Sequence, residues 1–530
     1  MSRTPLFAAA KKALALSFRE TGIVLPQKSA LTRRRLLRLS AAAAGAAALS
    51  PALSWTARAQ KEPPSVGIVG GGVAGLTAAY RLQKAGAKPV LFEASNRWGG
   101  RMLTIYDFYK GMFCELGGEF VDTDQEEIQS LSKELGLKMQ LLDVAGGEDL
   151  YFFGGKWHTP KDMLDPKKRK GAFVPIAKQV AADAGKLTDK NDEWTDYAQE
   201  LDKMSLKAYL DQFRGKTDDW AIDLLDVAYV GEFGLETEDQ SSLNMVDFIG
   251  TNLKKPFAIF GDSDQALRIK GGSSALIKAL EAALKDKADM RLGYPLTELG
   301  VQDGKIVMTF DVPDGPKSES FDTVILTLPF TKLREVKGLE SLELEPLQLQ
   351  AINELSYGTN AKLFSGTKTR VWQSKDSGLP ARSDGYFYSD LGFQNIWDQS
   401  ANQPGEAGIL TNFVGGKAGL AEESTARKIL NDGLATMAPK ISESLDPLAV
   451  ASFFWATYPY TLGSYASASV GQYTTLLDVT AEPALDGRVQ FAGEHTSVDW
   501  LGYMNGGVAS GDRAAGALIK QLGLKKQKKK

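Results

Sequence analysis

Three glycines, Gly70, Gly72 and Gly75, follow a short apolar run in the spacing Gly-x-Gly-x-x-Gly. In a turn between a strand and a helix, the first glycine permits a tight turn, and the second leaves room for a pyrophosphate. The third lets the helix pack closely on the strand. The free N–H groups of the helix then face the phosphates. Glu93, twenty-three residues beyond Gly70, can accept hydrogen bonds from both ribose hydroxyls. These residues predict a dinucleotide site.

The elements around these glycines fit that prediction. Val66 to Val69 is β-branched and too short for a stable helix, so we expect a buried parallel strand. Apolar residues from Leu76 to Leu82 recur at helical spacing, and Gly86 takes the place of a C-cap glycine. Pro89 to Phe92 is expected to be a second strand ending on the acid. A lone glycine motif is weak evidence, but here four features agree.

Two arginines follow in the segment Arg97-Trp98-Gly99-Gly100-Arg101. Their guanidinium groups can reach phosphate or flavin oxygens, which nicotinamide enzymes do not usually need. Together with the glycine turn, the segment resembles the flavin amine oxidase family, which includes monoamine, polyamine and L-amino acid oxidases. The resemblance implies FAD. It also implies an α/β fold: a Rossmann-like FAD-binding domain built from discontinuous segments, with an inserted α+β substrate domain.

The chain changes character along its length in a way that suggests the domain bounds. Residues 125 to 255 become helical and charged, whereas 267 to 284 return to the glycine-then-helix style. Strands are expected at Lys305 to Phe310 and at Thr323 to Leu328, where Pro329 ends the second. The predicted FAD-binding domain comprises residues 63–124, 262–340 and 482–523, and the predicted substrate domain comprises residues 125–261 and 341–481.

The family resemblance implies which residues contact the cofactor. A Gly117-Gly118 doublet interrupts an expected strand, and GRVQFAGEHTSVDWLGYMNGG near the C-terminus is the second diagnostic stretch. The predicted cofactor-binding residues are Gly70, Gly72, Val73, Ala74, Gly75, Glu93, Ala94, Arg97, Gly99, Gly100, Arg101, Gly117, Gly118, Glu119, Phe120, Glu494, Gly502, Tyr503 and Met504. Ser464 stands where monoamine oxidases place a flavin-linking cysteine, so FAD is expected to bind noncovalently.

Three residues are expected to act in catalysis. By resemblance, Lys362 matches the lysine that holds a water against flavin N5, although a strand lysine that reaches solvent is the plain alternative. Tyr465 and Tyr503 match the two aromatic residues that flank the amine in monoamine oxidases. The expected reaction passes a hydride from the α-carbon of a neutral amine to N5. The imine then hydrolyses, and O2 reoxidises the flavin to give H2O2.

The substrate class stays open at this stage. Amino acid oxidases of this family place an arginine just past the glycine doublet, where this chain has Phe120. This difference disfavours an L-amino acid oxidase, although Arg268 could substitute. Polyamine oxidases place an acid at the position of Asp122, which leaves a diamine open. A desaturase or protoporphyrinogen-type oxidase shares the N-terminal motifs, but Lys362 and the two tyrosines favour amines.

Composition excludes several other classes. With 530 residues and 43% hydrophobic content, the chain can bury a large core. Two histidines and a single cysteine, Cys114, rule out an intrachain disulfide and a cysteine-rich zinc site, and they disfavour a Ser-His-Asp arrangement. No metal is expected. Cys114 itself is expected to be a small buried side chain.

The first fifty-nine residues are expected to be a leader outside the fold. Thr32-Arg33-Arg34-Arg35-Leu36-Leu37 resembles a twin-arginine export motif, followed by the Ala-rich run Ala41 to Leu53 and an Ala57-Arg58-Ala59 cleavage pattern. The run is too short and weakly apolar for a stable membrane span, and a membrane anchor or disordered leader is the alternative. The prediction is export by the twin-arginine route to the periplasm or outside the cell.

Residues 60–530 carry 52 basic and 64 acidic side chains, a net charge of about −12. This charge argues against nucleic acid and is compatible with attraction of cationic substrates. The final residues, 524–530, are expected to be a solvated basic tail. The expected partners are an amine or amino acid, O2 and the twin-arginine export machinery, with a homodimer left open.

Overall fold

The computed structural model describes residues 64–142, 147–159, 174–249 and 265–524. The predicted leader, residues 1–59, and the predicted basic tail after residue 524 lie outside these ranges. Within the described ranges, no helix has the length and apolar character needed to cross a membrane.

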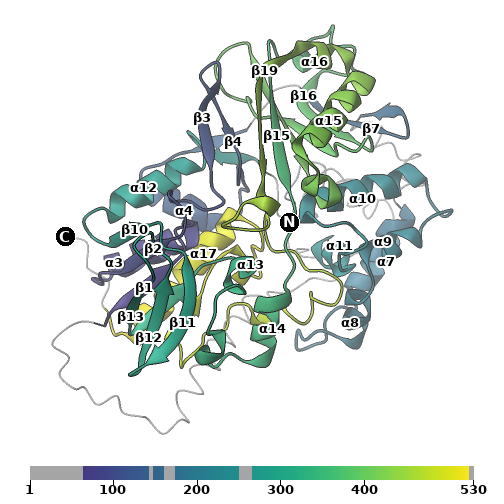
Figure 1. The fold of residues 1–530 in the computed structure, drawn as a ribbon. Helices are drawn as coiled ribbons and strands as arrows, with labels where there is room; N and C mark the ends of the chain where they lie inside the picture. The colour runs from purple at the N-terminus through teal and green to yellow at the C-terminus, as the bar shows by residue number, and fades with distance from the viewer. Residues whose placement is uncertain (1–63, 143–146, 160–173, 250–264, 525–530) are drawn as a thin grey trace.

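A five-stranded parallel sheet organises the first domain (Figure 1). Three distant parts of the chain contribute to it, as expected for a domain of discontinuous segments. The strands, in spatial order, are β10 (Asp289–Leu292), β2 (Val90–Glu93), β1 (Val66–Val69), β14 (Thr323–Leu326) and β20 (Val489–Phe491). All neighbouring pairs run parallel. The carboxyl ends of β1 and β2 therefore meet at one edge, which places the glycine turn beside Glu93.

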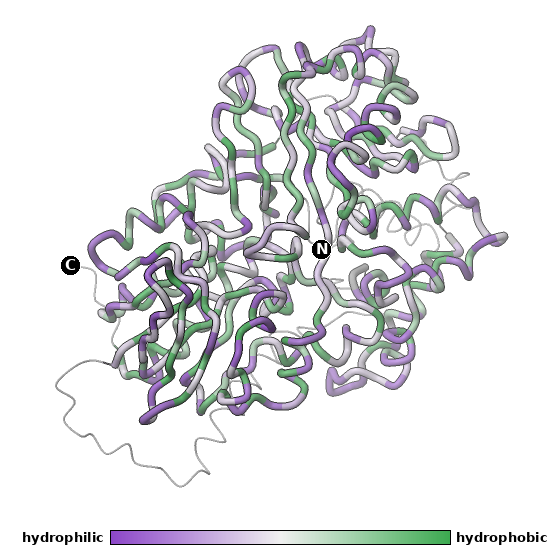
Figure 2. Tube along the Cα trace, in the orientation of Figure 1, coloured by the Kyte–Doolittle hydropathy of each residue, from purple (hydrophilic) through white to green (hydrophobic). Residues whose placement is uncertain are grey.

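Helices cover one face of this sheet and a small antiparallel sheet covers the other. The helices are α3 (Val73–Lys84), α4 (Glu126–Glu134), α12 (Ser274–Leu284) and α17 (Met504–Gln521). The antiparallel strands are β11 (Leu296–Gln302), β12 (Lys305–Phe310) and β13 (Lys317–Phe321). Phe92 of β2 stacks on Phe310 of β12 with ring centroids 4.3 Å apart, which joins the two sheets. Helix α12 buries Leu276, Ile277, Leu280 and Leu284, which share one side of the helix, and hydrophilic residues interrupt this apolar pattern along its trace (Figure 2).

A seven-stranded mixed sheet forms the second domain. Its strands, in spatial order, are β19 (Leu445–Phe454), β15 (Ala361–Thr367), β18 (Gly408–Val414), β17 (Asn395–Asp398), β16 (Ser383–Ser389), β7 (Glu148–Phe153) and β8 (Lys156–His158). The two predicted substrate segments therefore meet in one sheet, because β7 pairs with β16. Figure 1 shows β15 and β19 running through the middle of the molecule toward the first domain.

Helices pack on both faces of the seven-stranded sheet. One core holds α15 (Glu423–Met437) and α16 (Pro439–Ser444). The other holds α7 (Val174–Ala184), α8 (Asp196–Asp202), α9 (Leu206–Asp211), α10 (Asp219–Phe233) and α11 (Leu243–Ile249), the helical group at the right of Figure 1. Tyr151 stacks on Tyr388 at 5.1 Å beneath this group. The helical character predicted for residues 125–255 is present, although β7 and β8 interrupt it.

Two helices assigned by sequence to the substrate segments pack on the first domain. The apolar side chains Ile128 and Leu131 of α4 belong to the core around α3 and α17. Helix α14 (Pro346–Glu354) likewise buries Ala351 and Ile352 in the core between the two sheets of that domain. Both helices face the core of the first domain because their apolar residues recur at helical spacing. The sequence shows this spacing but not which sheet it faces.

Short strands carry the chain from the first domain to the site. β3 (Thr104–Tyr109) and β4 (Met112–Glu115) form a hairpin, and β5 (Phe120–Val121) pairs with β9 (Leu267–Ile269), which also pairs with β6 (Met139–Leu141). The predicted Gly117-Gly118 break falls between β4 and β5. This break positions Glu119 and Phe120 where the two domains meet.

Candidate active site

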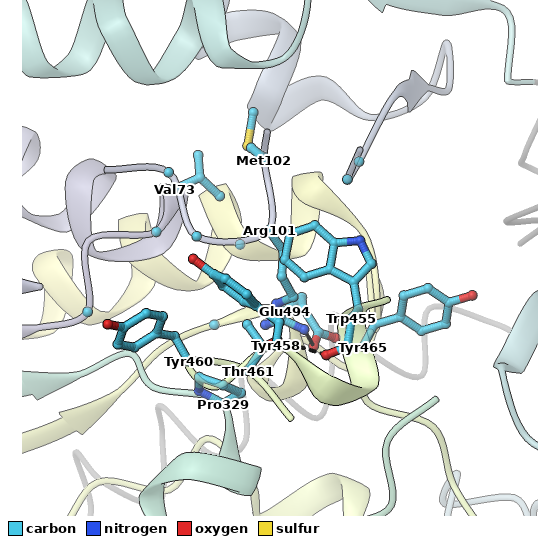
Figure 3. A pocket seen from close by; sticks show the side chains of 18 of the residues that line it. Val73, Arg101, Met102, Pro329, Trp455, Tyr458, Tyr460, Thr461, Tyr465 and Glu494 are labelled. Carbon is cyan, nitrogen blue, oxygen red and sulfur yellow. Dashed lines mark hydrogen bonds and ion pairs between the residues drawn. The ribbon is translucent and has the colours of Figure 1, made fainter. Parts of the chain in front are cut away.

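A cavity of about 630 Å³ lies between the two domains. Side chains from both ends of the chain line it, and Figure 3 shows Arg101 close to Glu494 near the centre of the cavity. Lys362 and Tyr465 line the cavity, and so do all the predicted cofactor-binding residues except Gly75. Gly75 instead lies behind the turn, where an added Cβ would stand 2.0 Å from the carbonyl oxygen of Gly70. The sequence motif therefore identifies one continuous site, with Gly75 serving the packing of the turn.

The glycine turn has the form of a phosphate cradle. Gly70 has a φ of +107°, which a residue with a side chain rarely adopts. An added Cβ at Gly72 would meet no atom within 4 Å, so this glycine faces open space in the cavity. Gly72 is also the N-cap of α3, whose first N–H groups and dipole favour an anion.

Glu93 closes the turn at the end of β2. Its Oε2 accepts a hydrogen bond of 2.7 Å from the Gly71 N–H, and its Oε1 accepts one of 2.9 Å from the Ser95 N–H. The carboxylate is therefore fixed at the cavity wall, and its remaining lone pairs can accept from a ribose.

Arg101 and Glu494 join the two diagnostic stretches. The guanidinium Nη1 lies 2.6 Å from Oε1 of Glu494 and also donates to the Ser464 carbonyl at 3.0 Å. Glu494 further accepts from the N–H groups of Ala466 and Gly502 at 3.1 and 2.6 Å. Burial raises the pKa of Glu494, but the charge and hydrogen bond of Arg101 outweigh burial, so the pKa lies below its usual value.

The glycine doublet allows close packing as well as access to the cavity. An added Cβ at Gly117 would lie 1.8 Å from the Arg101 carbonyl oxygen, and one at Gly118 would lie 2.7 Å from Cγ of Met504. A side chain at Gly117 would meet backbone, whereas one at Gly118 would require the Met504 side chain to move. The doublet therefore brings the backbone of the Arg101 segment and the start of α17 against the same wall.

Lys362 is buried rather than exposed, with 5% of its surface accessible. Its Nζ donates to the carbonyl oxygens of Glu115 and Gly117 at 3.0 and 2.9 Å, and it lies 3.3 Å from Oε2 of Glu119. It also stands over the Trp397 ring at 5.0 Å. The interpretation as a strand lysine that reaches solvent is wrong. Each of the three ammonium protons has an acceptor among the described residues.

Glu119 has a second pair of fixed neighbours. Trp397 donates its indole N–H to Oε2 at 3.2 Å, and Gln399 donates its amide to Oε1 at 2.7 Å. The carboxylate and the Lys362 ammonium therefore form a buried ion pair held in one geometry. Both groups line the cavity.

Aromatic side chains form the rest of this wall. Trp397 lies between Phe120 and Phe413, with a ring-centroid distance of 5.5 Å to each. Tyr465 donates its hydroxyl to the carbonyl oxygen of Glu232 at 2.8 Å, which anchors it to the end of α10. Sequence reasoning missed Trp397 and Phe413, because they lie in strands that carry no glycine signature. The only available signal was that each is an aromatic residue in a predominantly apolar strand, which indicates burial but not a position on the cavity wall.

Ser464 and Cys114 lie as the sequence suggests. The Ser464 hydroxyl donates to Oδ1 of Asn360 at 2.7 Å on the cavity wall. Cys114 is fully buried in the core beside the β3–β4 hairpin, and burial raises the pKa of its thiol to about 12. The thiol is therefore held in its unreactive, protonated form.

Arg268 does not reach the cavity. Its side chain is buried and donates to the carbonyl oxygens of Gln399 and Ala401 at 3.4 and 2.5 Å. Burial lowers the pKa of this guanidinium, although the charges of Glu119 and Glu115 act in the opposite direction. The expectation that Arg268 could bind a substrate carboxylate is therefore not supported by its position. The described residues also contain no cluster of metal-ligating side chains.

These features fit FAD. The open space at Gly72 and the N-terminus of α3 suit a pyrophosphate, and the Glu93 carboxylate suits a ribose. The same cavity, of about 630 Å³, is lined by these residues, by Arg101 and by the aromatic wall, so it joins the two domains. A Rossmann-like domain, a mixed-sheet domain and a cavity of this kind define a two-domain flavoprotein oxidoreductase.

Comparison with known proteins identifies the family. The model of the flavin containing amine oxidoreductase family matches residues 73–519, and the chain belongs to this family. It is therefore a flavin-dependent amine oxidoreductase. Nicotine dehydrogenase from Pseudomonas putida (strain DSM 28022 / S16) is 26% identical over 465 residues, covering 86% of this chain and 88% of that protein. L-amino-acid oxidase from Bungarus fasciatus is 24% identical over 481 residues, with 86% of each chain covered.

The solved structure of cyclohexylamine oxidase from Brevibacterium oxydans IH-35A has the same fold. It aligns with a TM-score of 0.73 over 87% of this chain and 100% of that chain, at 21% identity. The predicted α/β fold with a discontinuous FAD-type domain and an inserted second domain is confirmed. The names of these relatives span amines and an amino acid, so similarity does not determine the substrate.

Proposed function

We propose that this protein oxidises an amine with a noncovalently bound FAD and uses O2 as the electron acceptor. FAD held by the glycine turn, Glu93 and Arg101 would supply hydride acceptance at N5 from the carbon next to the amine nitrogen and electron transfer to O2 to give H2O2. The imine product then hydrolyses to a carbonyl compound. The protein supplies the binding, orientation and electrostatics of the site.

One observation carries this proposal: the aromatic part of the cavity wall also carries carboxylates, and the ammonium group beside them is already paired. Its carboxylates are Glu119 and Asp122, and its ammonium group, that of Lys362, is fully engaged. Aromatic side chains that line the cavity with them include Phe120, Trp397, Phe413, Tyr465 and Tyr503. Such a wall accommodates an apolar amine, by cation–π contact or as the neutral base.

The alternative substrate, an L-amino acid, finds no unpaired guanidinium among the described residues that line the cavity. The two described arginines that line the cavity already have partners, since Arg97 donates to the Gly100 carbonyl at 2.7 Å and Arg101 pairs with Glu494. Arg268 is bound to backbone carbonyls outside the cavity. A buried substrate carboxylate without a cation would lose its solvation, which costs several kcal/mol. The geometry therefore favours an amine over an amino acid.

A desaturase or protoporphyrinogen-type oxidase remains the less favoured function. Such a reaction removes hydrogen from a carbon skeleton and has no need for a fixed carboxylate beside an ammonium. Lys362, Tyr465 and Tyr503, all lining the cavity, support amine chemistry instead. We assign Lys362 a role as a fixed positive charge on the cavity wall rather than as the holder of a water, because each of its three ammonium protons already has a protein acceptor. We assign the two tyrosines a role in confining the amine.

We also propose that the protein reaches the periplasm or the exterior through the twin-arginine route. The support is the Arg33-Arg34-Arg35 motif and the alanine-rich run that follows it. A folded, FAD-loaded enzyme is the kind of cargo this route carries. The domain bounds given above likewise stay a proposal, with α4 and α14 packing on the FAD-binding side.

A peroxide-coupled screen tests the proposal. Purified, FAD-loaded protein is incubated in air with a panel of primary, secondary and diamines and, in parallel, with all L-amino acids. We expect H2O2 from one or more amines and none from amino acids. Peroxide from an amino acid alone would overturn the amine assignment, and reduction of FAD by amines without peroxide would overturn the choice of O2.

A further inference from the structure

The strongest feature not used by the proposed reaction is the carboxylate of Glu119. It lies on the cavity wall with 6% of its surface accessible, and its charge faces the Lys362 ammonium. A surface carboxylate could serve solubility, but a buried one needs fixed partners. Glu119 has three: Lys362, Trp397 and Gln399, at 3.3, 3.2 and 2.7 Å.

These partners leave the carboxylate one free acceptor direction. A carboxylate has about four lone-pair sites, and the three contacts from described residues fill three of them. Oε1 accepts from Gln399 alone among the described residues, so it can accept a hydrogen bond from a second donor. An amine that enters as its ammonium ion is such a donor.

The charge of the amine makes this contact important. An aliphatic amine has a pKa near that of the lysine side chain, about 10.4, so at pH 7.5 roughly one molecule in a thousand is the free base. The reaction needs the nitrogen lone pair of the free base. A site that admits only this form would lose about a thousandfold in apparent affinity.

On the basis of the proposed function, we propose that Glu119 receives the substrate as an ammonium ion and takes the proton that the amine must lose. One N–H bond of the ammonium breaks, an O–H bond forms on Glu119, and the electron pair stays on nitrogen. No oxidant takes part, and the transfer leaves the net charge of the site unchanged. Glu119 is thus a catalytic residue for substrate deprotonation.

Trp397 and Gln399 position this carboxylate, and the Lys362 ammonium lies beside it as its counter-ion. Once Glu119 is protonated, the charge of Lys362 is no longer offset. Several other titratable groups act electrostatically on Glu119 or on its pair with Lys362, from β4, β9 and β16: Cys114, Glu115, Arg268 and Tyr386. Of these, only Glu115 is a second carboxylate, and its side chain does not line the cavity.

Calorimetry with an amine that cannot be oxidised tests this proposal. 2-Phenylpropan-2-amine has no hydrogen on the carbon next to nitrogen, so it binds without reacting. FAD-loaded protein is titrated at pH 7.5 in buffers of different ionisation enthalpy, and the dependence of the binding heat on the buffer gives the protons released. We expect nearly no proton release for the wild type. For Glu119→Gln we expect about one proton released per amine bound, because only the free base can then enter.

A matched control is Glu115→Gln, which removes a buried carboxylate whose residue offers Lys362 only its backbone carbonyl. Its carboxylate is held by Ser273 and Thr104 rather than by the cavity wall, at 2.6 and 2.8 Å to Ser273 and 2.9 Å to Thr104. We expect this variant to release no proton, like the wild type. A second arm, Asp122→Asn, removes another carboxylate that lines the cavity and should also leave the proton balance unchanged.

The pH dependence gives an independent readout. The dissociation constant of the wild type should stay flat from pH 7 to 9, whereas that of Glu119→Gln should fall about tenfold per pH unit. If the wild type releases about one proton per amine bound, the role of Glu119 is overturned. The same holds if Asp122→Asn releases this proton and Glu119→Gln does not. Either result would leave the proposed function intact. No amine binding by the wild type, together with a failed peroxide screen, would overturn both.

Discussion

Arg101 and Glu494 are 393 residues apart in the chain and form an ion pair of 2.6 Å on the wall of the cavity. Figure 3 shows the two side chains pointing toward one another. The contact ties the segment after the first βαβ unit to the segment before the last helix. Because Glu494 also holds the backbone of Ala466 and Gly502, one carboxylate aligns three parts of the site.

Glu494→Gln should therefore weaken both FAD binding and the fold. Gln can accept from one N–H but does not offset the Arg101 charge, and breaking a buried pair from one side costs roughly 3–5 kcal/mol. We expect a lower Tm and a loss of FAD on gel filtration. Thermal melting with and without added FAD, and the FAD content per chain, measure these effects.

The exposed pair Lys428 and Asp432 provides the control. These two residues form an ion pair on α15 of the second domain, and both side chains are largely exposed. Asp432→Asn should lower the free energy of unfolding by less than about 1 kcal/mol, and Tm should change little. An equal effect of the two substitutions would contradict the structural role of Glu494.

Gly72 and Gly75 should respond differently to alanine. A Cβ at Gly72 points into open space, so Gly72→Ala should fold but bind FAD weakly, since the methyl group lies where a phosphate would approach. A Cβ at Gly75 would meet the Gly70 carbonyl oxygen at 2.0 Å, so Gly75→Ala should lose stability even without FAD. Tm of the FAD-free proteins and titration with FAD separate the two effects. Equal FAD-free Tm values would show that the two glycines share one role.

Sequence reasoning located the FAD-type end of the site well because its requirements are local. A strand, a turn without side chains, a helix N-terminus and an acid follow one another within residues 66–93, and each leaves a mark on the sequence. The same holds for the C-terminal stretch around Glu494. Backbone conformation at glycines is a property of a few neighbouring residues, so a single sequence shows it.

The substrate end depends on contacts between distant strands. Trp397 and Gln399 come from β17 and the turn after it, yet they fix Glu119 from more than 270 residues away in sequence. Nothing in their local sequence distinguishes them from other core residues. The packing of α4 on α17 was missed for the same reason, since an amphipathic helix shows that it has a partner but not which one.

His495 should make the protein sensitive to acid. Burial lowers the pKa of this histidine to about 3, and neither ring nitrogen has a hydrogen-bond partner among the described residues. Between pH 6.5 and 3 the unfolded chain takes up a proton that the native protein does not, so the free energy of unfolding falls as the pH falls. The loss is about 1.4 kcal/mol per pH unit in this window.

His495→Phe should flatten that slope, because the ring packs against Phe330 at 4.4 Å and gives up no hydrogen bond. Urea unfolding at several pH values from 7 to 4 measures the effect. His158, which is only partly buried, serves as the control, and His158→Phe should keep the wild-type slope. An unchanged slope in His495→Phe would show that other groups cause the acid sensitivity.

FAD should leave the denatured protein completely. Ser464, on the cavity wall, has a hydroxyl that donates to Asn360 and cannot form a thioether, while the thiol of Cys114 is buried in a different core. After acid precipitation and centrifugation, all yellow colour should appear in the supernatant. Colour retained in the pellet after repeated washing would mean a covalent link.

Lys362→Met should separate the structural role of this lysine from its chemical role. Removing the ammonium leaves Glu119 buried without its counter-ion, which costs roughly 3–5 kcal/mol and lowers Tm. The double variant Lys362→Met with Glu119→Gln removes both charges, so its Tm should recover toward that of the wild type. Both variants should still bind FAD, since neither residue contacts the glycine turn.

The loss of the chemical role should persist in the double variant even though its stability is restored. In the double variant, the positive charge that would favour O2 reduction is still absent, so the O2-dependent half of turnover should slow by roughly a hundredfold, the usual cost of one preorganised charge. Stopped-flow measurement separates this half from reduction by the amine. If O2 reacts at the wild-type rate in the double variant, Lys362 acts only through its pairing with Glu119. If the Tm of the double variant stays as low as that of Lys362→Met, the unpaired charge of Glu119 is not the cause of the lost stability.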